Sequence, residues 1–265
     1  MKNALLFSFF PLWIFGPNCM YKDWDAQHYK LNSQLHYENA MNVINQLSFR
    51  GDEVVLDIGC GDGRITYDIA KRVPHGSMIG IDPSANMIEE AKKSFADVKN
   101  MSFEQIGAED FTFDILFDLI VSFFALHYVS NHEKVLENIF TALKPNGTFI
   151  ALMALRQPDI ATYDYWSDIF AGQEKWNTKT EAEYKYMLEK AGFKNIIVKA
   201  EETSYFFATK KDLFNWIWGC APYIAGFDQE KALQIATEIV DTIANGKEEN
   251  IEMKGPNLYV KAEKT

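Results

Sequence analysis

The sequence predicts an α/β protein with a seven-stranded, mostly parallel sheet that carries helices on both faces. Short apolar runs alternate with helical patterns at the spacing of strand–helix–strand units over the first half of the chain. The runs that begin near Glu53, Phe117 and Thr148 are almost continuously apolar, as expected for strands buried on both faces. A glycine-rich turn joins the first of these runs to the helical pattern that follows it.

The first half of the chain divides into regular elements. Apolar and aromatic residues recur at helical spacing from Asp25 to Leu47, which predicts one or two helices before the first strand. Five strands are expected at Glu53–Ile58, Ser77–Asp82, Met101–Ile106, Phe117–Phe123 and Thr148–Ala154. The intervening helices are expected at residues 63–73, at 84–96 with Ser84 as the N-cap, and at 133–143 before the turn of residues 144–147.

The second half is less regular. Helices are expected at Ala161–Ala171, Thr180–Ala191, Lys210–Trp218 and Asp228–Ala244, and strands at Asn195–Ala200 and Met253–Ala262. The segment between these two strands, about residues 205–246, is too long for a hairpin turn. It predicts a helical cap over the carboxyl-terminal edge of the sheet, where open α/β sheets bind ligands. We expect one domain over residues 20–265, preceded by an apolar extension at residues 1–19.

Residues Val54 to Gly63 read V-V-L-D-I-G-C-G-D-G and form the most informative motif. The strand ends in an acid, Asp57, and the turn contains Gly59, Gly61 and Gly63. Glycine allows conformations closed to other residues and lets a ligand lie against the main chain. A second acid, Asp82, ends the next strand, where a carboxylate can accept hydrogen bonds from a ribose.

Two kinds of nucleotide site compete for this motif. A dinucleotide site would show G-x-G-x-x-G and a pyrophosphate at the helix N-terminus. This turn is instead G-x-G-x-G with Asp57 before it, and that carboxylate would repel a phosphate but suits an ammonium group. The motif resembles D/E-x-G-x-G-x-G, the S-adenosylmethionine (SAM) loop of class I methyltransferases, which have a Rossmann-like fold. An unrelated tight turn is the plain alternative.

The resemblance continues along the chain. Residues 106–110, I-G-A-E-D, are similar to the family's adenine-side G-D-A-E-D, although Gly107 replaces the usual Asp. Residues 122–129, S-F-F-A-L-H-Y-V, and the L-K-P-N-G turn at residues 143–147 resemble segments of small-acid methyltransferases. The opening Asp23-Trp24-Asp25 with Tyr29 is similar to enzymes of the trans-aconitate and juvenile-hormone-acid type. This resemblance also implies a final antiparallel strand inserted beside the sixth.

The resemblance assigns a cofactor site for SAM. It implies that Asp57 and the three glycines hold the methionine part of SAM and that Asp82 holds the ribose. Ala108 and Glu109 would lie beside the adenine, and Ser122 is a further cofactor-site candidate. Trp24 and Tyr29 would form a lid over SAM, with helix-packing aromatics as the alternative.

The charge of the chain favours a small-molecule substrate. There are 37 Asp and Glu against 26 Lys and Arg, a formal net charge of −11. That balance disfavours nucleic acid, whose phosphates dominate affinity, and also an anionic membrane surface. No N/D-P-P-Y/F motif follows the fourth strand, which counts against methylation of nucleobase nitrogen. A carrier-protein substrate is possible, although an acidic carrier would be repelled.

Three cysteines, Cys19, Cys60 and Cys220, are too few and too scattered for a disulfide framework, and no metal-ligand spacing is present. The apolar stretch from Ala4 to Phe15 is too short to span a bilayer. It resembles a signal segment but lacks a cleavage site. Because SAM is made in the cytosol, we expect a cytoplasmic protein with a misassigned start. Export or membrane association remains the alternative.

Candidate substrate residues follow from position and chemistry. His127 follows the fourth strand and could bind a substrate oxygen or act as a base, with a structural histidine as the alternative. His36 or Gln34 lies near the sequence position at which relatives carry a substrate-binding Gln. Arg156 lies beyond the fifth strand and could clamp a carboxylate, although a solvated loop residue is the simpler interpretation. Trp216 and Trp218 could form an apolar wall or belong to a core.

A SAM-dependent O-methyltransferase of a small organic or fatty carboxylic acid is the favoured hypothesis. A carboxylate is ionised at neutral pH, so the absence of an obvious catalytic dyad is expected. One alternative methylates carbon or a phenol, as in quinone-type metabolism, with His127 as the base. The other is a SAM-binding module without catalytic activity.

Overall fold

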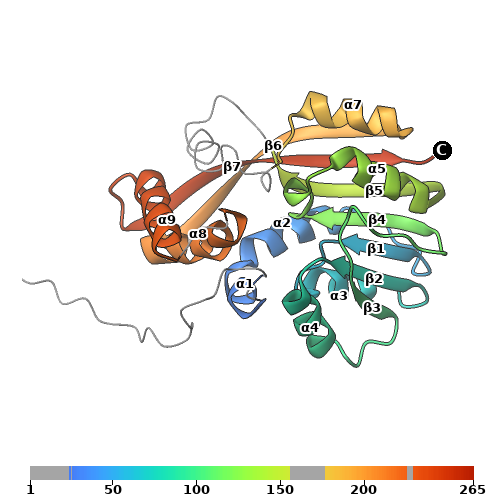
Figure 1. The fold of residues 1–265 in the computed structure, drawn as a ribbon, viewed down its shortest axis with the longest axis horizontal. Helices are drawn as coiled ribbons and strands as arrows, with labels where there is room; N and C mark the ends of the chain where they lie inside the picture. Colours follow the sequence, from blue (N-terminus) through green and yellow to red (C-terminus); the bar gives the residue numbers. More distant parts are fainter. Residues whose placement is uncertain (1–23, 25, 156–176, 226–228) are drawn as a thin grey trace, which may run out of the picture.

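The computed structural model describes Trp24 and residues 26–155, 177–225 and 229–265. A single seven-stranded sheet runs through the molecule in the order β3-β2-β1-β4-β5-β7-β6 (Figure 1). The first five strands are parallel, and β7 is antiparallel to both β5 and β6. The predicted α/β fold and the inserted antiparallel strand are both confirmed.

Most elements lie close to their predicted positions. The strands are β1 Val54–Ile58, β2 Ser77–Asp82, β3 Met101–Gln105, β4 Phe117–Phe123, β5 Leu143–Ala154, β6 Lys194–Thr209 and β7 Glu249–Glu263. The helices are α1 Ala26–Asn32, α2 Gln34–Ile44, α3 Arg64–Ala70, α4 Ala85–Ser94, η1 Leu126–Tyr128, α5 His132–Ala142, α7 Glu181–Ala191, α8 Lys210–Ala225 and α9 Gln229–Ala244. The helix expected at residues 161–171, the extension at residues 1–19 and Arg156 lie outside the described residues.

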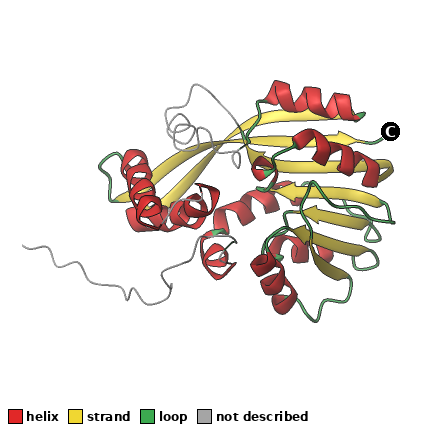
Figure 2. Ribbon diagram, viewed as in Figure 1, coloured by secondary structure: helices red, strands yellow, loops and turns green. Residues whose placement is uncertain are grey.

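Helices cover both faces of the sheet (Figure 2). Helices α5 and α7 pack on one face, which includes Leu56 and Ile120. Helices α2 and α3 pack on the other face, which includes Val55 and Val121. Neighbouring residues of one strand, such as Val55 and Leu56, thus face opposite sides of the sheet, as the two-residue period of a strand requires.

Helix termini follow the local sequence signals. Ser84 caps α4, since its hydroxyl accepts a hydrogen bond from Met87 N at 3.2 Å. Thr180 and Glu183 form a reciprocal capping box at the start of α7, and Gly192 ends that helix with a φ of 101°. These polar contacts fix where each helix begins and ends.

The sixth strand is much longer than predicted. It continues past Ala200 to Thr209 and pairs with β7 back to Glu249, whereas β5 pairs with β7 only from Asn257 onward. The two strands therefore leave the sheet as a ribbon, and residues 205–209 of the predicted cap are strand. Helices α8 and α9 pack on this ribbon around Tyr205, Phe207 and Met253.

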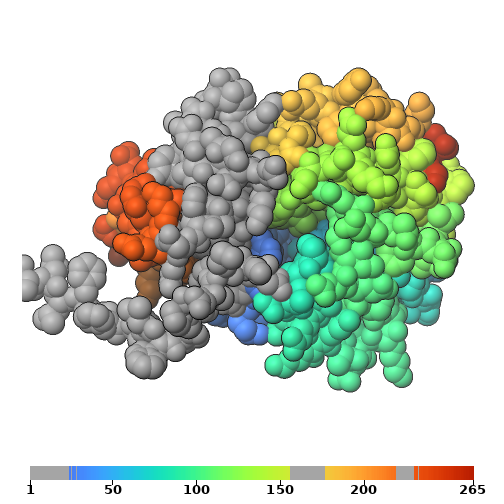
Figure 3. Space-filling model, viewed as in Figure 1, coloured from blue at the N-terminus to red at the C-terminus, as the bar shows by residue number. Residues whose placement is uncertain are grey.

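Helix α1 lies between the main sheet and helix α8, which packs on the ribbon of β6 and β7 (Figure 1). It contacts α8 on one side and α4 on the other. Figure 3 shows blue atoms from this part of the chain beside the cyan atoms that follow β1. Within the described ranges, no helix is long and apolar enough to cross a membrane.

Candidate active site

The glycine loop between β1 and α3 is held against the ends of β2 and β4. Gly59 donates its amide to Ile81 O at 2.7 Å and has a φ of 75°. A Cβ at Gly59 would lie 2.1 Å from the Cβ of Ala125, and a Cβ at Gly63 would lie 2.6 Å from the ring of Phe103. These positions require glycine because both the conformation and the space exclude a side chain.

Asp82, at the end of β2, fastens this loop. Its Oδ2 accepts a hydrogen bond from Gly61 N at 3.0 Å, and its Oδ1 accepts one from Ser84 N at 2.9 Å. The residue is only 9% exposed. A carboxylate placed among backbone amides at a strand end is oriented toward the adjoining cavity.

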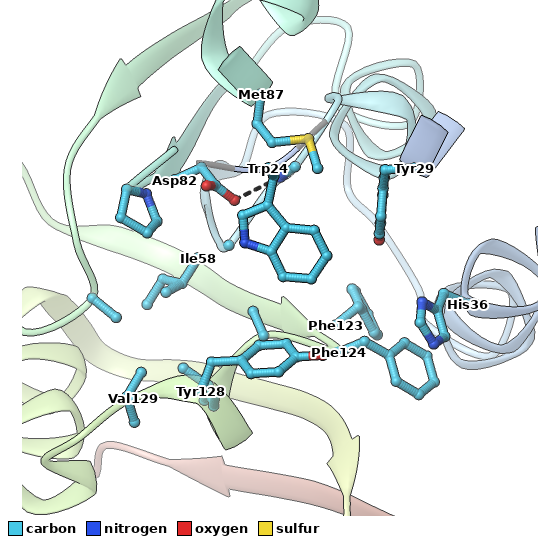
Figure 4. Close-up of a pocket in the computed structure, with 16 residues that line it drawn as sticks. Trp24, Tyr29, His36, Ile58, Asp82, Met87, Phe123, Phe124, Tyr128 and Val129 are labelled. Carbon is cyan, nitrogen blue, oxygen red and sulfur yellow. Dashed lines mark hydrogen bonds between the residues drawn. The ribbon is translucent and has the colours of Figure 1, made fainter. Parts of the chain in front are cut away.

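A cavity of about 150 Å³ opens beside Asp82 and the glycine loop. Figure 4 shows Asp82 at one end of it and His36 with Phe124 at the other, with Trp24, Tyr29 and Tyr128 between them. The lining includes seven residues that the sequence predicted: Trp24, Tyr29, His36, Gly59, Gly61, Asp82 and Ala108. It also includes residues that the sequence analysis missed, among them Met87, Phe123, Phe124, Tyr128 and Val129.

A smaller polar cavity adjoins the first, and Tyr29, Gly59 and Phe123 line both. Asp57, Asp62 and Arg64 lie in its wall. Asp62 was not predicted, although its side chain is 6% exposed and its Oδ2 is buried without a hydrogen-bond partner among the described residues. An unpaired buried carboxylate oxygen favours a cationic ligand group at this position.

The environment of Asp57 raises its pKa to about 7. Burial is the main cause, the nearby charge of Asp82 adds to it, and the hydrogen bond from Thr66 Oγ1 at 2.7 Å opposes it. This carboxyl group therefore exchanges its proton near neutral pH.

His36 lies where α2 meets β4 and α8. Its ring stacks on Phe124 with the centroids 4.4 Å apart, and the Trp216 ring lies 5.8 Å away. The Nδ1 of His36 and the Nε1 of Trp216 are both buried and have no hydrogen-bond partner among the described residues. Burial lowers the pKa of His36 to about 4, so the imidazole is neutral at pH 7.

Several predicted residues, Trp216 among them, lie outside the lining of the large cavity, and three of these make hydrogen bonds with the backbone. His127 is buried, its Nδ1 accepts a hydrogen bond from Ala154 N at 3.5 Å, and burial lowers its pKa to about 3. Ser122 donates from its hydroxyl to Ile58 O at 2.8 Å and so ties β4 to β1. Glu109 Oε1 accepts hydrogen bonds from Ser130 N and Asn131 N.

Two further candidates lie away from the large cavity. Gln34 is exposed on α2, where its amide donates to Glu38 and accepts from Arg64. Trp218 stacks on Phe214, which lies one turn earlier on α8, with the ring centroids 6.1 Å apart. Within the part of the chain that is described, no group of three or more His, Cys, Asp or Glu side chains is placed to bind a metal ion.

Comparison with known proteins identifies the class. The architecture and loop define a Rossmann-like enzyme whose ligand lies at the carboxyl-terminal ends of the strands. The chain belongs to the family described as methyltransferase domain, whose profile matches residues 50–192. It is a class I SAM-dependent methyltransferase, as the glycine-loop resemblance implied.

Two curated relatives and one solved structure illustrate the similarity. The juvenile hormone acid O-methyltransferase of Bombyx mori is 28% identical over 69% of this chain and 73% of its own. A ubiquinone/menaquinone biosynthesis C-methyltransferase of Hydrogenovibrio crunogenus is 30% identical over 63% of this chain and 69% of its own. The YcgJ protein of Bacillus subtilis shares the fold, with a TM-score of 0.66 and 20% identity over 86% of this chain and 99% of its own.

The residues present fit SAM. The ammonium of its amino-acid end and its sulfonium are cationic groups, and the small cavity offers the buried carboxylates of Asp57 and Asp62. Its ribose requires acceptors such as Asp82, and its adenine requires apolar surface such as Met87 and Ala108 in the large cavity. The two cavities share a wall, and their carboxylates and apolar side chains together match the parts of an extended nucleoside with an amino-acid tail.

The raised pKa of Asp57 predicts pH-dependent affinity for S-adenosylhomocysteine. A bound ammonium favours the ionised carboxylate, so binding must expel a proton when the pH is below about 7. Affinity is therefore expected to fall about tenfold per pH unit below that value. Titration calorimetry across this range checks it, and Asp57→Asn should flatten the profile. Equal affinity of the native protein at about pH 6 and pH 8 would contradict the prediction.

Proposed function

We propose that this enzyme transfers the methyl group of SAM to the carboxylate oxygen of a small organic or fatty acid. The observation that carries the proposal is a pair of buried polar atoms, His36 Nδ1 and Trp216 Nε1, for which the described part of the chain supplies no hydrogen-bond partner. The two rings pack edge to face with their centroids 5.8 Å apart, and of the two His36 lines the large cavity. The indole Nε1–H, and the imidazole in its Nδ1–H tautomer, would each donate a hydrogen bond, which suits the two oxygens of one carboxylate.

The chemistry agrees with the absence of a strong base. The described lining of the large cavity contains no Lys, Arg or Cys, and its single histidine has a pKa near 4. A carboxylate is already ionised at pH 7 and needs orientation rather than deprotonation, whereas a phenol or an amine would require a base. SAM supplies an electrophilic methyl group.

Each part of the site has a proposed role in that transfer. Asp57, Gly59, Gly61, Gly63 and Asp82 would hold the cofactor, and Trp24 and Tyr29 would exclude water. His36 and Trp216 would orient the acceptor with its oxygen about 3 Å from the methyl carbon and opposite the sulfur.

The helices α8 and α9 are proposed to cap the acceptor end of the site. Phe214, Trp216 and Trp218 of α8 gather on the side of the ribbon that holds the apolar cluster with Tyr205 and Phe207. Such a wall suits an acid with a hydrophobic tail. The name of the Bombyx mori relative, which acts on juvenile hormone acid, agrees with this acceptor class.

The decisive experiment offers the protein SAM and a panel of acceptors. The panel contains short and long carboxylic acids, phenols, quinone precursors and amines, and mass spectrometry detects methylated products. Methyl esters of acids are the expected result. A methylated quinone-precursor ring would instead favour the function in the name of the Hydrogenovibrio crunogenus relative. S-adenosylhomocysteine binding without any methylated product would favour a non-catalytic module.

Removal of either nitrogen donor should impair acceptor use. We expect His36→Ala and Trp216→Phe each to lower kcat/KM for the acid by about 10-fold, because each loses a hydrogen bond to a charged group of about 1.5 kcal/mol. The affinity for S-adenosylhomocysteine should stay unchanged. His75→Ala, at an exposed histidine, is the matched control. An unchanged kcat/KM in both variants would refute the assignment.

A further inference from the structure

Helix α1 supplies the outer wall of the large cavity, through Trp24 just before it and Tyr29 within it. Their rings pack edge to face with the centroids 5.9 Å apart, and Trp24 also packs on Tyr128. In Figure 4 the Trp24 ring lies beside Asp82 and the Tyr29 ring lies on the side of His36, and both rings line the cavity that Gly59 and Gly61 border. A ligand that fills the cavity therefore lies behind α1.

One carboxylate on α4 accepts hydrogen bonds from two side chains of α1. Glu90 Oε2 accepts a hydrogen bond from Gln27 Nε2 at 2.7 Å, and Glu90 Oε1 accepts one from Lys30 Nζ at 2.9 Å. Ser94 Oγ, one turn further along α4, donates to the same Oε1 at 2.9 Å. Two side chains of α1 thus converge on a single carboxylate, and Lys30 also donates to Ser94 Oγ at 3.4 Å.

A second contact ties the start of α1 to α4. Asn86 Nδ2 donates to the backbone oxygen of Trp24 at 3.0 Å. Glu90 and Asn86 lie four residues apart and hence on the same side of α4. The contacts therefore hold both ends of the segment that carries Trp24 and Tyr29.

Glu90 is well placed to hold a charge in this position. Its side chain is 11% exposed, whereas that of Lys30 is 46% exposed. The hydrogen bond from Lys30 lowers the pKa of Glu90, so the carboxylate is ionised at neutral pH. Glu90 does not line the large cavity, so any influence on a ligand must act through α1.

We propose that Glu90 is a positioning residue that latches α1 over the bound cofactor and sets the residence time of SAM and S-adenosylhomocysteine. The inference rests on the proposed cofactor site. Because the latch closes the wall without touching the ligand, its loss mainly accelerates dissociation. The ion pair between Glu90 and Lys30 thereby determines how long the cofactor stays bound.

The test measures dissociation of S-adenosylhomocysteine by stopped-flow fluorescence of the full-length protein. Glu90→Gln should accelerate dissociation by about 3- to 5-fold and leave the association rate nearly unchanged. Lys30→Gln, at an exposed position on α1, should accelerate it by a similar factor. Glu89→Gln, the neighbouring exposed acid on α4, is the matched control and should leave the rate unchanged.

Two readouts separate a latch from a general loss of structure. Added salt should accelerate dissociation from the native protein more than from Glu90→Gln, because salt screens an ion pair that the variant lacks. The double variant Glu90→Lys with Lys30→Glu should recover slow dissociation relative to either single reversal. A local unfolding effect would reproduce neither result.

The outcomes also distinguish this inference from the function on which it rests. Slow dissociation that is equal in the native protein, Glu90→Gln and Lys30→Gln would overturn the latch and leave the cofactor site intact. No binding of S-adenosylhomocysteine to the native protein would instead refute the cofactor site. Faster dissociation without recovery in the double reversal would also overturn the latch, because the pairing itself would then have no effect.

Discussion

Replacement of Asp82 by alanine is expected to weaken the binding of S-adenosylhomocysteine by about 100-fold or more. The carboxylate would hold the ribose hydroxyls, and it accepts hydrogen bonds from Gly61 N and Ser84 N. Hydrogen bonds to a charged group contribute about 1.5–3 kcal/mol each, and 1.4 kcal/mol corresponds to a factor of ten in affinity. Loss of two such bonds to a ligand therefore gives at least the stated factor. Titration calorimetry measures it.

Controls for this variant come from the same chain. Asp97→Ala, at an exposed position after α4, should leave affinity unchanged. Asp82→Asn retains one acceptor oxygen and should give an intermediate loss of affinity. An affinity of Asp82→Ala within threefold of the native value would remove Asp82 from the cofactor site.

The parallel part of the fold could be predicted because its signals are local. Strands β2 and β4 lie where the sequence placed them, at Ser77–Asp82 and Phe117–Phe123, because each is a short apolar run between turn residues. Strand β6 was predicted to end at Ala200 because Glu201 to Ser204 are polar. These residues belong to an exposed ribbon whose stability comes from pairing with β7, some 50 residues later along the chain, and no local pattern reports that pairing.

The residues of the proposed cofactor site could be picked out for the same reason. The glycine loop and Asp82 occur in a short motif, and the structure brings Gly59, Gly61 and Asp82 to one cavity. The acceptor side depends on how distant elements meet. His36 of α2 and Trp216 of α8 are 180 residues apart in the sequence, yet their rings are neighbours.

The placement of His127 shows a local limit of sequence analysis. Phe124 has a φ of 55°, a left-handed conformation that is uncommon for a bulky residue. The chain therefore changes direction directly after β4, and Leu126 and Tyr128 line the cavity while His127 does not. No pattern in S-F-F-A-L-H-Y-V predicts that turn, so the sequence alone could not show that His127 lies outside the lining of the large cavity.

The close approach of Gly59 to β4 leads to the largest expected effect on stability. We expect Gly59→Ala to lower the free energy of unfolding by about 3–4 kcal/mol, as measured by urea denaturation. The new Cβ would lie 2.1 Å from the Cβ of Ala125, and overpacking of this kind costs about 1–3 kcal/mol. The φ of 75° adds about 1–2 kcal/mol of backbone strain for any residue with a side chain.

A second substitution divides that loss into its two causes. Ala125→Gly in the Gly59→Ala background removes the overlapping Cβ and should restore about 2 kcal/mol. The backbone strain of about 1–2 kcal/mol should remain, because the φ of residue 59 is fixed by the hydrogen bond from its amide to Ile81 O. Ala125→Gly alone should cost about 1 kcal/mol or less, the usual price of added chain entropy. Equal stability of Gly59→Ala with and without the second change would show that steric overlap is not the cause. The loop would then have to move away from Ala125, and with it the amide of Gly61 that Asp82 holds.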